Sequence, residues 1–408
     1  MGCYTYKMND KTHWVAITSF CNNNCLFCLD GKHKSNIFLS DFQIKKNILE
    51  GINNNCSRIV LSGGEASISP NFKEYIKYSK LVGYKHIQTI TNGRMFSNEL
   101  FLDECICAGL DEITFSIHSH RKDIFEQITN STMSYKQTYK GLINALSKKI
   151  IVSCDIVLNK LNIDEIDKTI AFLIKIGLRE FDIMQLMPFG SAWKNWDMLY
   201  YDIEKKKDKI NSAIALCKNN NVVVFTNKIP YNILDNNYDQ IQNPQKLYDE
   251  IRGRSEQIIE RLNSDSFLEC YPKRCKYCFL KDLCQFIIDS FKKCNKEEKK
   301  LNTKDTIIFS KMDNYYHNKS KIKIIDYYNL KFKNIPFCIM PKHLREKISF
   351  EDLTYDKKNF DLMYCTQIFI NHIKVKPIKC KDCFYNYKCK GISVLKAKKS
   401  GFNQLKPE

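Results

Sequence analysis

Three closely spaced cysteines are the residues of this chain best suited to metal chemistry. Cys21, Cys25 and Cys28 follow the apolar run 13–20 in a C-x3-C-x2-C pattern. A cubic 4Fe-4S cluster usually takes four cysteine thiolates, so three thiolates leave one iron open to a further ligand. The apolar run predicts a strand, which would put the thiols on the loop at its carboxyl end, where parallel α/β enzymes carry their active sites.

The spacing of these cysteines is unlike a chance arrangement. With 19 cysteines among 408 residues, it should arise only about 0.04 times in such a chain. Zinc is the alternative occupant, but structural zinc sites normally close with four ligands, often as two C-x2-C pairs. His33 is the nearest further candidate, and no fourth cysteine is close in sequence. The pattern therefore favours an iron-sulfur cluster with one open iron.

The stretch 21–28, with the aromatic Phe27 just before the last cysteine, resembles the signature of radical S-adenosylmethionine (SAM) enzymes. The resemblance implies that the amine and carboxylate of SAM chelate the open iron. It also implies that an electron from the reduced cluster cleaves SAM to methionine and a 5'-deoxyadenosyl radical, which abstracts hydrogen from a substrate. The electron donor would be a protein such as flavodoxin or ferredoxin.

Strand and helix patterns alternate after the cysteine motif. Strands are predicted at 13–20, 57–62, 86–90, 112–117, 149–158 and 180–186, and helices at 41–52, 72–82, 101–108, 135–147 and 163–176. Six alternations predict an α/β fold with a parallel sheet and right-handed crossovers. They resemble the partial (β/α)6 TIM-like barrel of the radical SAM family, which we expect over residues 10–226.

Glycine or polar residues stand at the carboxyl ends of these strands, where a parallel barrel gathers its active site. Gly63-Gly64-Glu65 resembles the family's GGE segment, since glycines let the backbone approach a ligand and an acid can pair with the SAM amine. Further strand-end residues resemble family positions near the SAM ribose, carboxylate or adenine: Thr91, Asn92, Gly93, Ser116, Asn159, Met187 and Pro188. Ordinary turn polarity is the alternative explanation for this second group. We expect His118 to be structural, and no catalytic acid or base is predicted.

The sequence predicts a separate cysteine-rich region at residues 227–408. This region begins with a linker at 227–245 and continues with a helix at 247–262. The segments 275–284 and 380–389 share the pattern C-K-x-C-F-x4-C. With one upstream cysteine each, they predict two four-thiol sites: Cys270, Cys275, Cys278 and Cys284, and Cys338, Cys380, Cys383 and Cys389. Cys294, in a lysine-rich insertion, or Cys365 could replace either upstream cysteine.

Zinc or iron-sulfur could fill these two sites. Their C-x2-C-x5-C spacing resembles part of the SPASM and twitch extensions that follow radical SAM barrels, although the further cysteine of the full pattern is missing. The resemblance favours two auxiliary 4Fe-4S clusters, which often accompany peptide maturation in related enzymes. We therefore expect a peptide or protein side chain as substrate, recognised with a separate protein, since no leader-binding domain is evident before residue 13. A small metabolite or RNA is the alternative, and a zinc-stapled binding module without enzyme activity is the distant one.

The net charge of +19 could indicate a nucleic-acid partner. However, 55 lysines stand against 9 arginines, and readers of phosphates and bases favour the arginine fork. We therefore expect lysines on solvated faces and no nucleic-acid substrate. The sequence contains no apolar run long enough for a membrane span and no signal peptide, so its cysteines predict metal clusters in a cytoplasmic protein.

Overall fold

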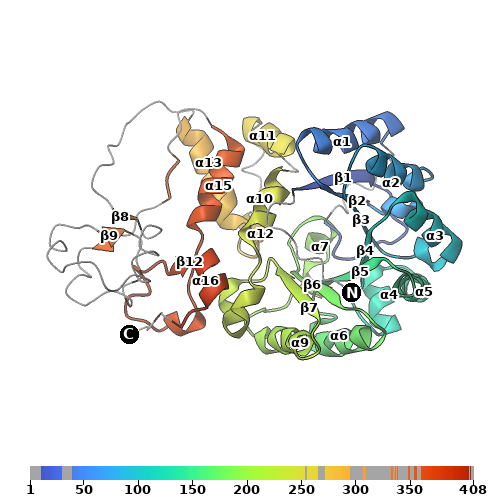
Figure 1. Ribbon diagram of the computed structural model, residues 1–408. Helices are drawn as coiled ribbons and strands as arrows, with labels where there is room; N and C mark the ends of the chain where they lie inside the picture. Colours follow the sequence, from blue (N-terminus) through green and yellow to red (C-terminus); the bar gives the residue numbers. More distant parts are fainter. Residues whose placement is uncertain are drawn as a thin grey trace, which may run out of the picture. The chain divides into compact units, whose positions relative to one another are not determined.

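The computed structural model describes residues 11–29, 39–252, 255–264, 272–294, 307–308, 332–333, 336, 338, 348–349, 353–355, 360–403 and 405. The chain divides into two compact units, residues 1–228 and 229–408, each with its own buried core (Figure 1). None of the helices in these described ranges has the length and apolar character needed to cross a lipid bilayer.

The first unit is built on a seven-stranded sheet in which every neighbouring pair is parallel. The strands lie in chain order: β1 (Thr12–Thr18), β2 (Arg58–Gly63), β3 (His86–Thr91), β4 (Glu112–Ser116), β5 (Ile151–Leu158), β6 (Glu180–Gln185) and β7 (Val223–Asn227). The predicted parallel α/β architecture is confirmed. A seventh strand, β7, adds to the six predicted ones, and among the described residues β1 and β7 lie at the two ends of the strand order.

Helices connect the strands and lie outside them (Figure 1). They are α1 (Asp41–Asn53), α2 (Phe72–Leu81), α3 (Glu99–Ala108), α4 (Lys122–Thr129), α5 (Ser134–Leu146), α6 (Ile166–Lys175), α7 (Gly190–Lys194), α8 (Trp196–Leu199) and α9 (Lys207–Asn219). A capping box starts α1, since the Ser40 hydroxyl accepts from the Gln43 amide while Gln43 Oε1 accepts from the Ser40 amide. Such local signals explain why the helices lie close to their predicted positions.

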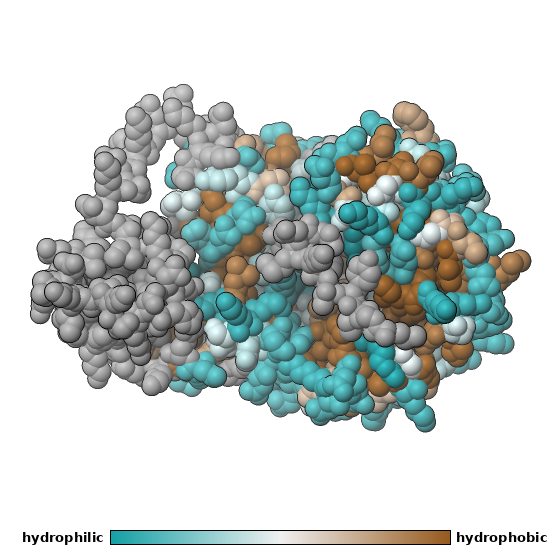
Figure 2. Space-filling view, viewed as in Figure 1, coloured by the Kyte–Doolittle hydropathy of each residue, from teal (hydrophilic) through white to brown (hydrophobic). Residues whose placement is uncertain are grey.

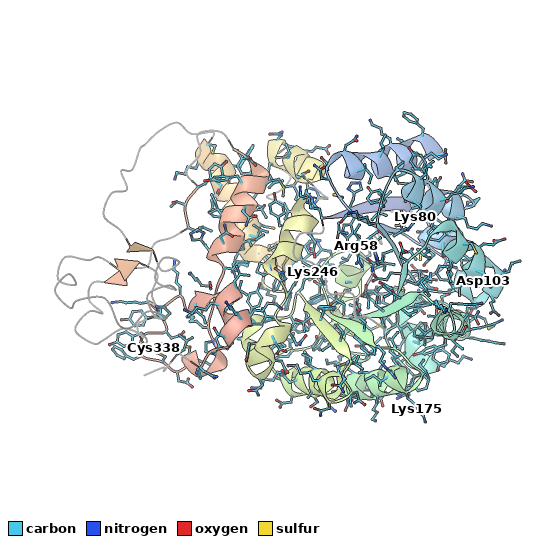
Figure 3. The ribbon with its side chains drawn as sticks, in the orientation of Figure 1. Arg58, Lys80, Asp103, Lys175, Lys246 and Cys338 are labelled. Atoms are coloured by element: carbon cyan, nitrogen blue, oxygen red, sulfur yellow. The ribbon has the colours of Figure 1, made fainter. Side chains whose placement is uncertain are left out.

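The two faces of the sheet differ in character because side chains alternate along each strand. Ile113, Phe115, Cys154 and Ile156 point outward and are fully buried. The inner face instead carries polar residues on the same strands, including Ser153. In Figure 3, Arg58 lies among the strands, whereas Lys80, Asp103 and Lys175 lie on the outer helices.

A closed polar network fills the inner face where the strands begin. Arg58 Nη2 lies 2.7 Å from Glu112 Oε2, and His86 Nε2 lies 2.8 Å from the same oxygen. Gln88 Nε2 donates to Glu112 Oε1 at 2.8 Å and to Thr114 Oγ1 at 2.6 Å. The charges of Arg58 and Glu112 therefore compensate each other at this end of the sheet.

The second unit is mainly helical. Its core includes side chains of α10 (Pro244–Arg252), α11 (Ser255–Asn263), α13 (Lys281–Cys294) and α15 (Leu362–His372). α10 and α11 together cover the described part of the range predicted as one helix, and the 3-10 helix η4 (Tyr231–Gln240) lies within the predicted linker.

The cysteine-bearing parts of the second unit are built from shorter elements. These are α12 (Pro272–Cys275), η9 (Ile378–Cys380), α16 (Val394–Ser400) and an antiparallel pair, β11 (Lys374–Val375) and β12 (Ile392–Ser393). A further small parallel sheet contains β8 (Ile307–Ile308), β9 (Phe332–Lys333) and β10 (Ile348–Ser349). On the face drawn in Figure 2, hydrophilic residues are spread over the surface and do not gather in one patch.

Candidate functional site

Cys21, Cys25 and Cys28 lie on the loop that follows β1, at the carboxyl end of the sheet. All three are partly exposed. The Cys28 amide donates to the Cys25 carbonyl at 3.2 Å, which closes the C-x2-C segment into a turn. The Asn23 amide lies 3.4 Å from Cys21 Sγ. An N–H group directed at sulfur is typical of thiolates that hold iron-sulfur clusters.

Arg94 fixes the first half of this cluster loop. Its Nη1 donates to the Asn22 carbonyl, to Asn23 Oδ1 at 2.9 Å and to Ser131 Oγ at 3.0 Å. Its Nε donates to Gln137 Oε1 at 2.6 Å. One planar guanidinium therefore ties the loop to α5 and to the segment before it.

Backbone pairing holds the middle of the loop against the end of α4. The Asn24 amide donates to the Thr129 carbonyl at 3.0 Å, and the Leu26 amide donates to the Ile128 carbonyl at 2.9 Å. These carbonyls belong to the last turn of the helix, where intrahelical donors are missing. The loop thereby satisfies the end of the helix while the helix orders the loop.

The last part of the loop packs on the start of α7. The Ser191 amide donates to the Cys28 carbonyl at 2.8 Å, and Asn195 Nδ2 donates to the Leu26 carbonyl at 3.1 Å. Gly190 has a φ of +55°, and a Cβ added there would lie 2.1 Å from the Leu29 carbonyl oxygen. Glycine is required at 190 because the two backbones approach so closely.

Gly64 and Glu65 lie directly against the end of β1. The Gly64 amide donates to the Thr18 carbonyl at 2.6 Å and the Glu65 amide to the Phe20 carbonyl at 2.8 Å. A Cβ on Gly64 would lie 2.2 Å from the Phe20 oxygen. The glycine therefore permits contact between the end of β2 and the segment just before Cys21.

The Glu65 carboxylate is buried, with 1% exposure, and hydrogen bonds surround it. Its Oε1 accepts from the Ser67 hydroxyl, from the Ser67 amide at 3.2 Å and from Thr91 Oγ1 at 2.7 Å, and its Oε2 accepts from the Asn92 amide at 2.7 Å. Burial raises the pKa of Glu65, while these hydrogen bonds oppose the rise. In this structure Glu65 joins the end of β2 to the end of β3.

The Thr91-Asn92-Gly93 segment reaches the cluster loop. Asn92 Nδ2 donates to Asn22 Oδ1 at 2.6 Å and lies 3.8 Å from Cys21 Sγ. Gly93 has a φ of +77°, and a Cβ there would lie 2.4 Å from the Phe115 ring. The structure thus brings three predicted site segments together: the cysteine loop, the GGE segment and the end of β3.

Phe27 and His118 form an edge-to-face pair, with ring centroids 4.5 Å apart. His118 is buried, and its Nδ1 accepts from the Val157 amide at 3.2 Å. Burial lowers the pKa of His118 to about 3, so its imidazole is neutral at physiological pH. This environment agrees with a structural histidine.

The remaining predicted SAM residues differ in accessibility. Asn159 is fully buried, and its side chain bonds within its own turn, accepting from the Leu161 amide at 3.0 Å and donating to the Val157 carbonyl at 3.2 Å. Ser116, at the end of β4, is half-buried. Met187 and Pro188 are buried after β6.

In the second unit, four predicted ligands gather at one place. Cys338, Cys380, Cys383 and Cys389 line a small pocket together with Lys376, Tyr385 and Asn386. The Cys383 amide donates to the Cys380 carbonyl at 3.2 Å, as in the Cys25–Cys28 turn. The Gly391 amide lies 3.4 Å from Cys389 Sγ. Burial and the neighbouring thiols raise the pKa of Cys380 to about 11, so a positive charge is needed to keep this thiol ionised at neutral pH.

The other cysteine group of this unit, Cys275, Cys278 and Cys284, contains a similar turn. The Cys278 amide donates to the Cys275 carbonyl at 3.2 Å. Its last member, Cys284, lies in the helix α13. Cys270, like His33 and residues 295–306 of the lysine-rich insertion, lies outside the described residues. Cys365 is fully buried in the helical core, against which Cys294 packs. Within the described ranges, no three His, Cys, Asp or Glu side chains form a ready-made site for a single metal ion.

Arg94 is the functional residue that sequence reasoning missed. It follows the Thr91-Asn92-Gly93 segment directly, and it is one of only 9 arginines beside 55 lysines. In so lysine-rich a chain, an arginine next to a predicted site is a usable signal, because its fork can serve several acceptors at once.

Comparison with known proteins agrees with this site. Residues 15–173 match the family model of the radical SAM superfamily. The match covers the cysteine loop and the strands β1 to β5, so this part of the chain is similar to the radical SAM superfamily.

Curated relatives are similar to less than half of this chain. A probable GTP 3',8-cyclase of Sulfurisphaera tokodaii is 31% identical over 179 residues, which cover 43% of this chain and 56% of that protein. A probable GTP 3',8-cyclase of Saccharolobus solfataricus is 28% identical over 206 residues, covering 48% of this chain and 64% of that protein. The chain thus spans less than two thirds of the length of these relatives.

Solved structures with a similar fold include methylornithine synthase, with 14% identity and a TM-score of 0.42 over 54% of this chain and 73% of that chain. Another is Streptococcus suis SuiB bound to the precursor peptide SuiA, with 11% identity and a TM-score of 0.46 over 57% of this chain and 52% of that chain.

Proposed function

We propose that this enzyme reductively cleaves SAM at the cluster loop and uses the resulting radical to modify a small, nucleotide-like metabolite. The observation that carries the first part is the convergence of Cys21, Cys25 and Cys28 with Gly64 and Asn92 at one end of the sheet. The second part rests on the names of the relatives, which are probable GTP 3',8-cyclases. GTP is therefore the first substrate to test.

The residues present fit a SAM-binding 4Fe-4S cluster. Three partly exposed thiols share a loop whose backbone is held on several sides, and N–H groups of Asn23 and Asn92 point toward Cys21 Sγ. When bound, the cluster and SAM supply the radical chemistry, with electrons from a donor such as flavodoxin or ferredoxin. The protein supplies three thiolates and keeps the loop rigid through Arg94, so that the ligands need little reorganisation on binding.

For the second unit we propose auxiliary 4Fe-4S clusters. Cys338, Cys380, Cys383 and Cys389 line one pocket and so would hold one cluster. Cys275, Cys278 and Cys284 would hold the other, with Cys270 as the proposed fourth ligand.

The comparisons favour a small metabolite over the peptide substrate that the sequence suggested. The expectation of peptide modification depended on the presence of two C-terminal cysteine groups, and such groups do not specify a substrate. A role in binding a peptide or a separate recognition protein finds no support in the relatives' names.

Anaerobic turnover tests the proposal. Reconstituted protein should convert SAM to 5'-deoxyadenosine when a chemical reductant is added, and GTP should be consumed with it. Cys25→Ala should abolish formation of 5'-deoxyadenosine, while Cys107→Ala, an exposed thiol of α3, should leave it unchanged. Unchanged SAM cleavage by Cys25→Ala would refute the cluster assignment. SAM cleavage by the wild type without consumption of GTP would refute GTP as the substrate and leave the proposed SAM cleavage standing.

A further inference from the structure

Two carboxylates lie side by side on the inner face of the sheet, beyond the network of Arg58 and Glu112. Asp155 of β5 and Asp182 of β6 are direct partners in the parallel register. Asp155 shares its face of β5 with Ser153, whose hydroxyl is 2.8 Å from that of Thr114. On its other side Asp155 pairs with Ser116, the last residue of β4. The carboxylate pair therefore lies near the strand ends that carry the predicted SAM residues.

Asn227 completes this group from the next strand. It is the last residue of β7, and its Nδ2 lies 3.5 Å from Asp182 Oδ2. Asn227 is 8% exposed, and its Oδ1 has no hydrogen-bond partner. A buried amide oxygen without a donor is unfavourable, so this oxygen indicates a position where a ligand donor would be stabilised.

The register neighbours on the same face, Ser116, Phe225 and Met184, are uncharged. Arg58 lies at the start of β2 and is bound to Gln88 and Glu112. Although the whole chain has a net charge of +19, this part of the inner face presents two carboxylates and an amide oxygen. Such an array matches a group rich in N–H donors.

We propose that Asp155, Asp182 and Asn227 form a substrate-binding subsite for the N–H donor edge of a small molecule. The edge is of the kind that guanine presents with its N1–H and 2-amino groups. A carboxylate can accept two parallel N–H groups at once, and the Asn227 oxygen can accept a third. A substrate that lacks a donor on this edge would leave a buried acceptor unpaired and would be rejected. This inference rests on the proposed action on a nucleotide-like metabolite.

Binding of GTP and of ITP, which lacks the 2-amino group, tests the subsite. The holoprotein is loaded with S-adenosylhomocysteine to prevent turnover, and affinities are measured by anaerobic calorimetry. The wild type should bind GTP at least about tenfold more tightly than ITP. Asp155→Asn and Asp182→Asn should each weaken GTP binding by about tenfold and change ITP binding much less. Asp208→Asn, an exposed residue of α9, is the matched control and should behave as the wild type.

Two further measurements separate binding from folding and from catalysis. Each variant must keep wild-type affinity for S-adenosylhomocysteine. Asn227→Asp keeps an acceptor and should therefore still bind GTP more tightly than ITP, whereas Asn227→Leu should lose this preference. Equal affinity of the wild type for GTP and ITP, binding of neither nucleotide, or unchanged GTP binding in both aspartate variants would overturn the subsite. Failure of the proposed function is a different observation, namely that the wild type forms no 5'-deoxyadenosine.

Discussion

Arg94 Nη1 lies 2.9 Å from Asn23 Oδ1, so the guanidinium directly contacts the loop that carries the three cysteines. The same nitrogen reaches Ser131 Oγ at 3.0 Å, and Nε reaches Gln137 Oε1 at 2.6 Å. Arginine can serve these acceptors together because its donors are fixed in one plane, whereas a lysine ammonium acts as a single point. The positions of the thiols therefore depend on a residue outside the motif.

Replacement of Arg94 by lysine should loosen the cluster loop without removing a thiol. We expect Arg94→Lys to retain less iron at the N-terminal site and to show a broadened electron paramagnetic resonance signal, with SAM cleavage reduced about tenfold or more. Arg179→Lys is the control, since Arg179 is exposed and donates to the backbone carbonyls of Ile174 in α6 and Leu178 after it, both at 2.8 Å. Equal iron content and an unaltered spectrum in Arg94→Lys would contradict this role.

Gly64→Ala should distort the contact between β2 and the segment before Cys21. The added Cβ would meet the Phe20 oxygen at 2.2 Å, and backbone cannot move aside as a flexible side chain can. We expect a loss of SAM affinity of at least about tenfold and a lower melting temperature. Gly83→Ala provides the comparison, because a Cβ there has nothing within 4 Å although its φ is +109°. It should cost some stability and leave SAM binding intact; equal SAM affinity in both variants would argue against the close approach.

Iron and zinc content should decide what the C-terminal cysteines hold. Three 4Fe-4S clusters require about twelve irons per chain, and Cys389→Ala should lower this to about eight. The N-terminal signal that responds to SAM should remain, because Cys389 lies in the other unit. Cys107→Ala, on the exposed side of α3, should keep all the iron. A wild-type content of about four irons and two zinc ions would exclude the auxiliary clusters.

His118 should make the fold sensitive to acid. Its pKa in the folded protein is about 3, well below the ordinary value of 6.5. Its stabilising contribution is therefore complete above pH 6.5 and is lost as the pH falls toward 3, because only the unfolded chain takes up the proton. Between pH 7 and pH 5 this loss amounts to about 2 kcal/mol of the free energy of unfolding.

Urea unfolding at several pH values measures that dependence. His118→Gln retains an acceptor for the Val157 amide but cannot titrate, so its free energy of unfolding should fall less between pH 7 and pH 5 than that of the wild type. His372→Gln, at an exposed position near the end of α15, should keep the wild-type slope. The same slope in His118→Gln as in the wild type would show that another group causes the acid sensitivity.

The local sequence was sufficient to predict much of the barrel and the order of its site segments. Apolar runs with period two and helices with cap residues such as Ser40 are local signals, and parallel connections constrain how such elements assemble. The spacing of Cys21, Cys25 and Cys28 is likewise a local signal. It favours an iron-sulfur cluster over other metal sites because such a cluster takes thiolate ligands. The strand β7 was missed because its apolar run is short and ends in a polar segment that includes Asn227.

The sequence by itself determined the cysteine spacing and the strand and helix alternation, and these patterns lead to the expectation of radical SAM chemistry. Only the tertiary structure decided that Arg94 clamps the cluster loop, that Glu65 is buried among the donors of Ser67, Thr91 and Asn92, and that Asp155, Asp182 and Asn227 share one face. The physical reason is that these relationships join residues of different strands and loops. Register, burial and hydrogen-bond partners arise only when the sheet forms, and no local spacing encodes them.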